Sequence, residues 1–265
     1  MFVMNSWVFS TLVVVTVAVL LSLAALVWVR KKVSIERLRK DHDAAGFTFS
    51  IIGVLYSVIL GFMVVNVQDR YREAEKNVRE EANLLVAMYH DATAFSNSET
   101  VRIRAALRSY VQSILDGQWK GTKDGTLPIE QHAHLWDSYY PVNVTDAKTQ
   151  VFFEQATEQL DRLMDMSLNR EFSAQEHLGS MMWTLLILGA VITTGFMLFF
   201  GLEDFKIQLM MTGLLGGYLA FILYLVVSLD HVFTGPMAVK PVVFEKTVQV
   251  FDELDREEPD RPSAD

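Results

Sequence analysis

The chain has 265 residues, of which 51% are hydrophobic and 21% charged, and its mean hydropathy is +0.23. Such a composition is typical of an integral membrane protein that also has a substantial aqueous portion. The sequence contains no cysteine, which excludes disulfides, thiolate metal sites and cysteine nucleophiles. A net charge of −9 argues against nucleic acid as a partner.

Four uncharged apolar stretches of membrane-spanning length form two pairs. They cover Trp7 to Val29, Phe47 to Val67, Met181 to Gly201 and Ile207 to Leu229. A hydrocarbon core about 30 Å thick takes roughly 20 apolar residues as a helix. We therefore predict an all-α, multi-pass protein of the cell membrane, or of the inner membrane in a bacterium, with the lipid bilayer around four transmembrane helices. The N-terminus lacks the features of a cleaved secretory signal, so we expect the first helix to remain in the mature protein.

The predicted organisation has four parts. Residues 1–67 hold the first two membrane helices and a short basic connector, 68–180 a helical aqueous domain, 181–229 the third and fourth membrane helices, and 230–265 an acidic C-terminal tail. The Lys and Arg residues of the connector place it in the cytoplasm by the positive-inside rule, and the aqueous domain outside. A second basic group, which begins at Arg70, weakens that bias.

The aqueous segment shows the apolar periodicity of helices. The second membrane helix is predicted to continue without a break into solvent, along a seam that would hold helices or subunits together and that includes Tyr71, Val78, Leu85 and Met88. An amphipathic helix is expected from a Ser98 cap to Gly117. A turn-rich linker, a short helix between Pro128 and Pro141, and a long helix over about 145–171 follow. The tail from Glu245 is expected to be solvated and disordered.

Small and polar residues form a stripe on the second membrane helix. Gly46, Ser50, Gly53, Ser57 and Gly61 are separated by three or four residues and so share one face. One interpretation is close packing of helices, and the other is the lining of a pore. For the Gly213 and Gly217 pair of the fourth helix, packing is favoured.

Polar residues also lie at the ends of the spans. Headgroup anchoring is their usual role, and a ring at the mouth of an oligomeric pore is the functional alternative; the candidates are Asn66, Gln68, Asp69 and Asp230. No nucleotide-binding, hydrolase or metalloprotease motif is present, so no enzyme, cofactor or metal site is predicted. His132 and His134 are interpreted as a surface or interface pair.

The stretch from His42 to Leu85, HDAAGFTFSIIGVLYSVILGFMVVNVQDRYREAEKNVREEANLL, resembles the signature of the bestrophin-like membrane proteins, a family whose domain has no assigned function. Further matches are SYVQSILDGQW, LNREFSAQEHLGSMMWTLL and SLDHVFTGPMAV, so the resemblance covers nearly the whole chain. The sequence departs from the family pattern at Gln68, Gln118, His231 and Val232.

The resemblance implies the architecture of bestrophins, which are pentameric channels permeable to chloride and in which the second membrane helix lines the pore. The expected function is therefore an oligomeric, anion-conducting channel, with inorganic ions and further copies of the chain as partners. The alternative is a non-conducting membrane scaffold or sensor that acts through its aqueous helices. Bestrophins keep the large domain in the cytosol, which conflicts with the positive-inside prediction.

Overall fold

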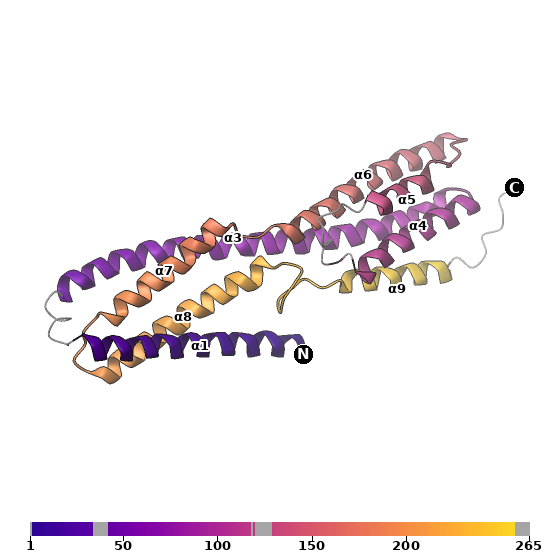
Figure 1. Ribbon diagram of the computed structural model, residues 1–265. Coiled ribbons are helices and arrows are strands. Elements are labelled where there is room, and N and C mark those ends of the chain that lie inside the picture. The colour runs from indigo at the N-terminus through magenta and orange to yellow at the C-terminus, as the bar shows by residue number, and fades with distance from the viewer. Residues whose placement is uncertain (1, 34–41, 118, 120–128, 258–265) are drawn as a thin grey trace. The chain divides into compact units, whose positions relative to one another are not determined.

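The structure is a computed structural model that describes residues 2–33, 42–117, 119 and 129–257 (Figure 1). Within these ranges the secondary structure is helical, and no strand is found there. Four helices are long and apolar enough to cross a membrane: Trp7–Lys32, Gly46–Ala94, Ser180–Leu198 and Phe205–Asp230. They confirm the four predicted transmembrane helices. Most of the basic connector, most of the 118–128 linker and the last eight residues lie outside the described residues.

The described chain divides into two compact units. The first comprises Met1–Arg70, His177–His231 and Gly235–Ala238, and the second comprises Tyr71–Glu176, Val232–Thr234 and Val239–Asp265. Helix α3 (His42–Asp91) is continuous and contributes to both, which confirms that the second membrane helix runs on without a break.

In the first unit, α1 (Phe2–Lys32) lies beside α8 (Phe205–Asp230), as Figure 1 shows. The two helices pack through glycines of α8. A Cβ added at Gly217 would lie 3.0 Å from Val19, and one at Gly216 would lie 2.6 Å from the Ser22 hydroxyl. The two helices are closer here than a side chain would normally allow, because a Cβ rarely approaches another heavy atom to such distances. A Cβ added at Gly213 would lie 3.6 Å from Val19 and Leu23, so both glycines of the predicted pair, Gly213 and Gly217, face α1, and their packing role is confirmed.

Helix α7 (Ser180–Leu198) packs closely against α3 at one point of the first unit. The Tyr56 ring lies over Gly189, where an added Cβ would come within 2.2 Å of it, and the Tyr56 hydroxyl donates to the Leu186 carbonyl at 2.8 Å. The contact buries the tyrosine face of α3. Gly53 and Ser57 of the small-residue stripe adjoin this contact.

The second unit is built from the remainder of α3, the short η1 (Ala92–Ala94), α4 (Asn97–Asp116), α5 (Ile129–Tyr139), α6 (Ala147–Gln175) and α9 (Val242–Glu257). The cap of α4 is Ser96, two residues before the predicted cap, because Ser96 and Glu99 form a capping box. The helix ends at its Gly117 cap, as predicted. The observed bounds of α5 and α6 agree with the two later helices predicted for this segment, apart from a few terminal residues.

The predicted seam of α3 lies inside one chain. Val78, Leu85 and Met88 are each at most 1% exposed in the core of the second unit, and Tyr71 packs against that core. A side chain enclosed by its own chain cannot contact another subunit. The seam therefore joins helices within one chain, and the assignment of these buried residues to an interface between subunits is wrong.

The prediction of a disordered tail is wrong for residues 245–257. They belong to α9, whose Phe244, Thr247 and Phe251 are buried in the second unit. Phe251 stacks on Tyr89 with ring centroids 3.9 Å apart. The apolar residues recur at spacings of three and four, so one face of this acidic segment packs while its charges remain outside.

Acid is expected to loosen α9, because the ionised carboxylate of Asp255 attaches this helix to α3 and α4. It accepts hydrogen bonds from Tyr89, Arg104 and Arg108 at 2.7 to 3.0 Å. Burial alone would raise the pKa of Asp255, but these hydrogen bonds and the two guanidinium charges lower it below its ordinary value. A carboxyl whose pKa is lowered by folding stabilises the folded state above its unfolded pKa, about 3.9, and this contribution is lost as the pH falls through the folded value.

A spin label on a single cysteine at the exposed Gln249 measures this loosening. Its mobility should rise below about pH 4 in the wild-type background. In Asp255→Asn the label should already be more mobile at neutral pH and should respond less to acid. An identical acid response in both proteins would show that another group controls α9.

Candidate functional site

The small-residue stripe of α3 is open in the single chain. Ser50, Ser57 and Gly61 are exposed and Gly53 is half-buried. A Cβ added at Gly53 or Gly61 would meet no atom within 4 Å. The glycines of α8 contact side chains of α1, and Gly46 of α3 lies against Phe200, but Gly53 and Gly61 are open among the described residues.

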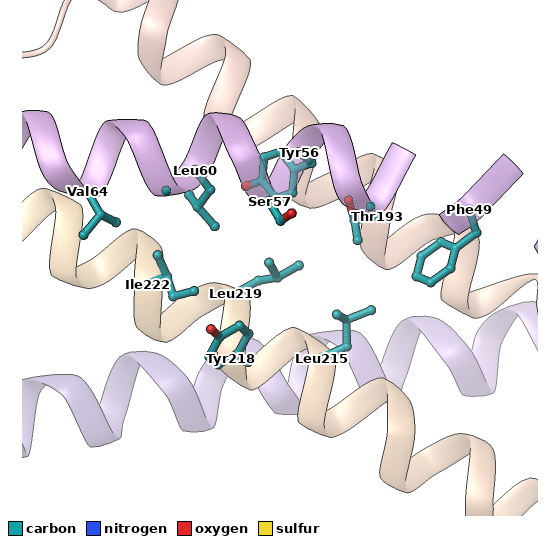
Figure 2. A pocket seen from close by; sticks show the side chains of 12 residues that line it. Phe49, Tyr56, Ser57, Leu60, Val64, Thr193, Leu215, Tyr218, Leu219 and Ile222 are labelled. Atoms are coloured by element: carbon teal, nitrogen blue, oxygen red, sulfur yellow. The ribbon is translucent and has the colours of Figure 1, made fainter. Parts of the chain in front are cut away.

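Part of this stripe lines a groove of about 280 Å³ in the first unit. Gly53, Ser57 and Gly61 form one wall, and residues of α7 and α8 form the others. Figure 2 shows Ser57 of α3 and Leu219 of α8 reaching into the same space. The groove is mostly apolar, and its hydroxyl groups come from Tyr56, Ser57, Thr193 and Tyr218.

The serine hydroxyls bond to their own helix. Ser50 Oγ donates to the Gly46 carbonyl at 2.9 Å, and Ser57 Oγ donates to the Val54 carbonyl at 2.8 Å. Each hydroxyl thereby replaces part of its hydration without a partner helix, and its lone pairs remain available to water or to a passing cation. The face can hold water without leaving unpaired donors.

Another part of the surface of α3 is suited to lipid. Val54, Leu55, Val58 and Phe62 are each more than half exposed in the single chain. Such side chains match hydrocarbon, and the hydroxyl-bearing stripe beside them differs chemically. The helix thus presents two kinds of exposed surface within its apolar span.

The four predicted pore-mouth residues differ in accessibility. Asn66 and Asp69 are exposed and Gln68 is half-buried. Asp230 is 2% exposed, and its Oδ1 accepts from Arg70 at 3.2 Å and from the Leu178 amide at 2.8 Å. A carboxylate so enclosed does not face a water-filled mouth, so that role is wrong for Asp230.

Two clusters were not recognised in the sequence. His177 and His231 lie beside Asp230 in the first unit. In the second unit, Glu81 pairs with Arg170 in the core. Each cluster joins residues more than 50 positions apart, so no local motif indicates it. His132, by contrast, bonds to Ser167 at 3.1 Å, and burial lowers its pKa.

The fold and this face define an all-helical membrane protein whose long second helix carries an open stripe of small residues. A bestrophin-like domain matches residues 12–244, and the chain therefore belongs to the bestrophin-like family. The family resemblance inferred from the motifs is confirmed. Gln68, Gln118, His231 and Val232, where the sequence departs from the family pattern, all lie within the matched region.

One solved structure with the same fold is described as the crystal structure of a membrane protein. It is 13% identical, with a TM-score of 0.61, and the match covers 95% of this chain and 99% of that one. At this identity the similarity concerns the fold alone. A search of curated proteins gives no match.

Proposed function

We propose that this chain is a subunit of a homo-oligomeric ion channel, a pentamer by family resemblance, in which the stripe of α3 lines the pore and chloride is the conducted ion. The observation that carries the proposal is the stripe itself. It lies in a membrane-spanning helix and bears hydroxyls and bare backbone, and among the described residues nothing packs onto Gly53 or Gly61.

The stripe fits conduction for a physical reason. Glycine brings backbone to the surface and serine adds a hydroxyl, and both solvate an ion better than the surrounding valine and phenylalanine side chains do. Arranged around a shared axis, such faces would form a narrow pathway with apolar neighbours that can gate by dewetting. Anion binding requires the Ser50 and Ser57 hydroxyls to turn from their carbonyls toward the ion.

A non-conducting scaffold is the second candidate. An open stripe of glycine and serine is also the surface on which another membrane helix packs closely. In that case a second copy or a partner would cover Gly61 and exclude water. The two functions therefore differ in one property, the access of water to the stripe.

Cysteine accessibility tests this property directly, because the chain has no native cysteine. In the oligomer in liposomes, Ser57→Cys should react with a charged, water-soluble thiol reagent. Val58→Cys, on the exposed apolar surface, should be protected by lipid. Protection at both positions would favour the scaffold.

Ion flux through reconstituted protein supplies the functional test. Gly61→Val should lower chloride flux at least about tenfold, which corresponds to an added barrier of about 1.4 kcal/mol. Gly195→Val on α7 is the matched control, because a Cβ there also meets no atom within 4 Å. Equal flux in both variants would remove the stripe from the conduction pathway, and potassium flux exceeding chloride flux would overturn the anion assignment.

A further inference from the structure

Three potential metal ligands converge at one end of the first unit. His177 lies in the segment between α6 and α7, Asp230 is the last residue of α8, and His231 follows it. A ring nitrogen of each histidine and a carboxylate oxygen of Asp230 all lie within 4.8 Å of one another. The two imidazole rings are tilted by 30°, with centroids 4.8 Å apart.

Backbone carbonyls orient both imidazoles. His231 Nδ1 lies 3.0 Å from the Val227 carbonyl oxygen, and His177 Nδ1 lies 3.3 Å from the Asp230 carbonyl oxygen. A carbonyl oxygen only accepts, so Nδ1 carries the proton in each ring. Nε2 of the neutral imidazole then has the free lone pair. A hydrogen bond from the other ring nitrogen to a carbonyl is the usual arrangement of a metal-binding histidine.

Of the two carboxylate oxygens of Asp230, one accepts hydrogen bonds and the other has no donor among the described residues. Oδ1 accepts from the Arg70 guanidinium and the Leu178 amide, which fix the carboxylate in place. Oδ2 is buried, and no group among the described residues hydrogen-bonds to it. A buried carboxylate oxygen without a donor is costly, and a cation beside the two histidines would remove that cost.

We propose that His177, Asp230 and His231 bind a divalent transition-metal ion, with zinc as the best match. Two imidazole nitrogens and one carboxylate oxygen are a ligand set that zinc and related ions accept, whereas calcium and magnesium prefer oxygen ligands alone. Ligand atoms around tetrahedral zinc stand about 3.3 Å apart, given bond lengths of about 2.0–2.1 Å. The histidine side chains are exposed, so they can close this distance around the fixed carboxylate.

The bound ion would tie the start of α7 to the end of α8. The three protein ligands leave a fourth position for water. Arg70 already offsets part of the Asp230 charge, so the site takes up its ion mainly through the two histidines. Metal binding here is independent of ion conduction and can be measured on protein that conducts nothing.

Equilibrium binding of Zn²⁺ and Co²⁺ to the full chain in detergent tests the site. The protein is stripped with a chelator and carries no histidine tag. The chain holds six histidines and no cysteine, so few other ligands compete. We expect one ion per chain, and bound Co²⁺ should show visible d–d absorption. Saturating Zn²⁺ should raise the melting temperature by on the order of 5 °C.

His177→Ala and His231→Ala should each weaken Zn²⁺ binding at least about tenfold, since even outer-shell partners of zinc ligands are worth about 10–100-fold. The matched control is the double variant His132→Ala and His134→Ala, which removes the other close histidine pair and should bind as the wild type does. Both test histidines are exposed, so their variants should fold. Absence of binding by the wild type, equal binding by all variants, or a preference for Ca²⁺ would overturn the proposal.

Discussion

Replacing Glu81 by alanine is expected to lower the free energy of unfolding of the second unit by about 3–5 kcal/mol. Glu81 is fully buried and Arg170 is 3% exposed. Arg170 Nε donates to one Glu81 oxygen at 2.9 Å, and Tyr110 donates to the other at 2.7 Å. Removal of the carboxylate leaves a guanidinium and a phenol enclosed in the core of the unit.

The charges of the pair depend on each other. Burial alone would lower the pKa of Arg170, but the Glu81 carboxylate raises it above its ordinary value. Burial, followed by the same carboxylate, raises the pKa of Tyr110, so the phenol stays protonated and donates. The network is therefore stable only as a complete set, because each buried polar group needs the hydrogen bonds that the other members supply.

Chemical denaturation of the detergent-solubilised protein, monitored by a signal from the second unit, measures the loss of unfolding free energy. Glu80→Ala is the matched control, because Glu80 is exposed and pairs with Lys76 at 3.6 Å, an arrangement worth under about 1 kcal/mol. The double variant Glu81→Leu and Arg170→Met should recover much of the lost stability, since apolar residues can replace a buried ion pair. Equal losses from Glu80→Ala and Glu81→Ala would refute the buried network.

The membrane helices could be predicted from sequence because their signal is local. A run of about 20 uncharged apolar residues indicates a membrane span by itself, whatever surrounds the helix in the fold. The continuation of α3 and the C-terminal end of α4 also follow from short patterns, such as the glycine at the C-cap of α4. The role of Glu81, however, could not be predicted, since its partner Arg170 lies 89 residues away. In the sequence Glu81 only interrupts an apolar pattern.

The predictions for α9 and Asp230 failed for the same physical reason, because burial depends on contacts that form only in the folded chain. The acidic composition of the tail favours solvent on average, but burial depends on which face carries Phe244 and Phe251. Asp230 ends a membrane helix, where polar residues usually anchor to headgroups, and only the fold brings Arg70 to it. The stripe of α3 was recognisable as one face, yet its exposure within the chain depended on where α7 and α8 pack.

Leu85→Asp is expected to unfold the second unit rather than separate folded subunits. Leu85 is 0% exposed, so an aspartate there places a charge in an apolar core without a partner. The cost exceeds the loss of a buried leucine, itself about 2–5 kcal/mol for truncation to alanine. Hydrogen exchange should show α4, α6 and α9 losing protection together with the second half of α3.

Asn83→Asp is the matched control, because it adds the same charge two residues away at an exposed position of α3. It should leave exchange protection within the variation of the wild type. If Leu85→Asp instead produced smaller assemblies whose helices kept full protection, Leu85 would lie between subunits. The burial of Leu85 within one chain argues for collapse of the unit, because an interface residue must keep surface free for its partner.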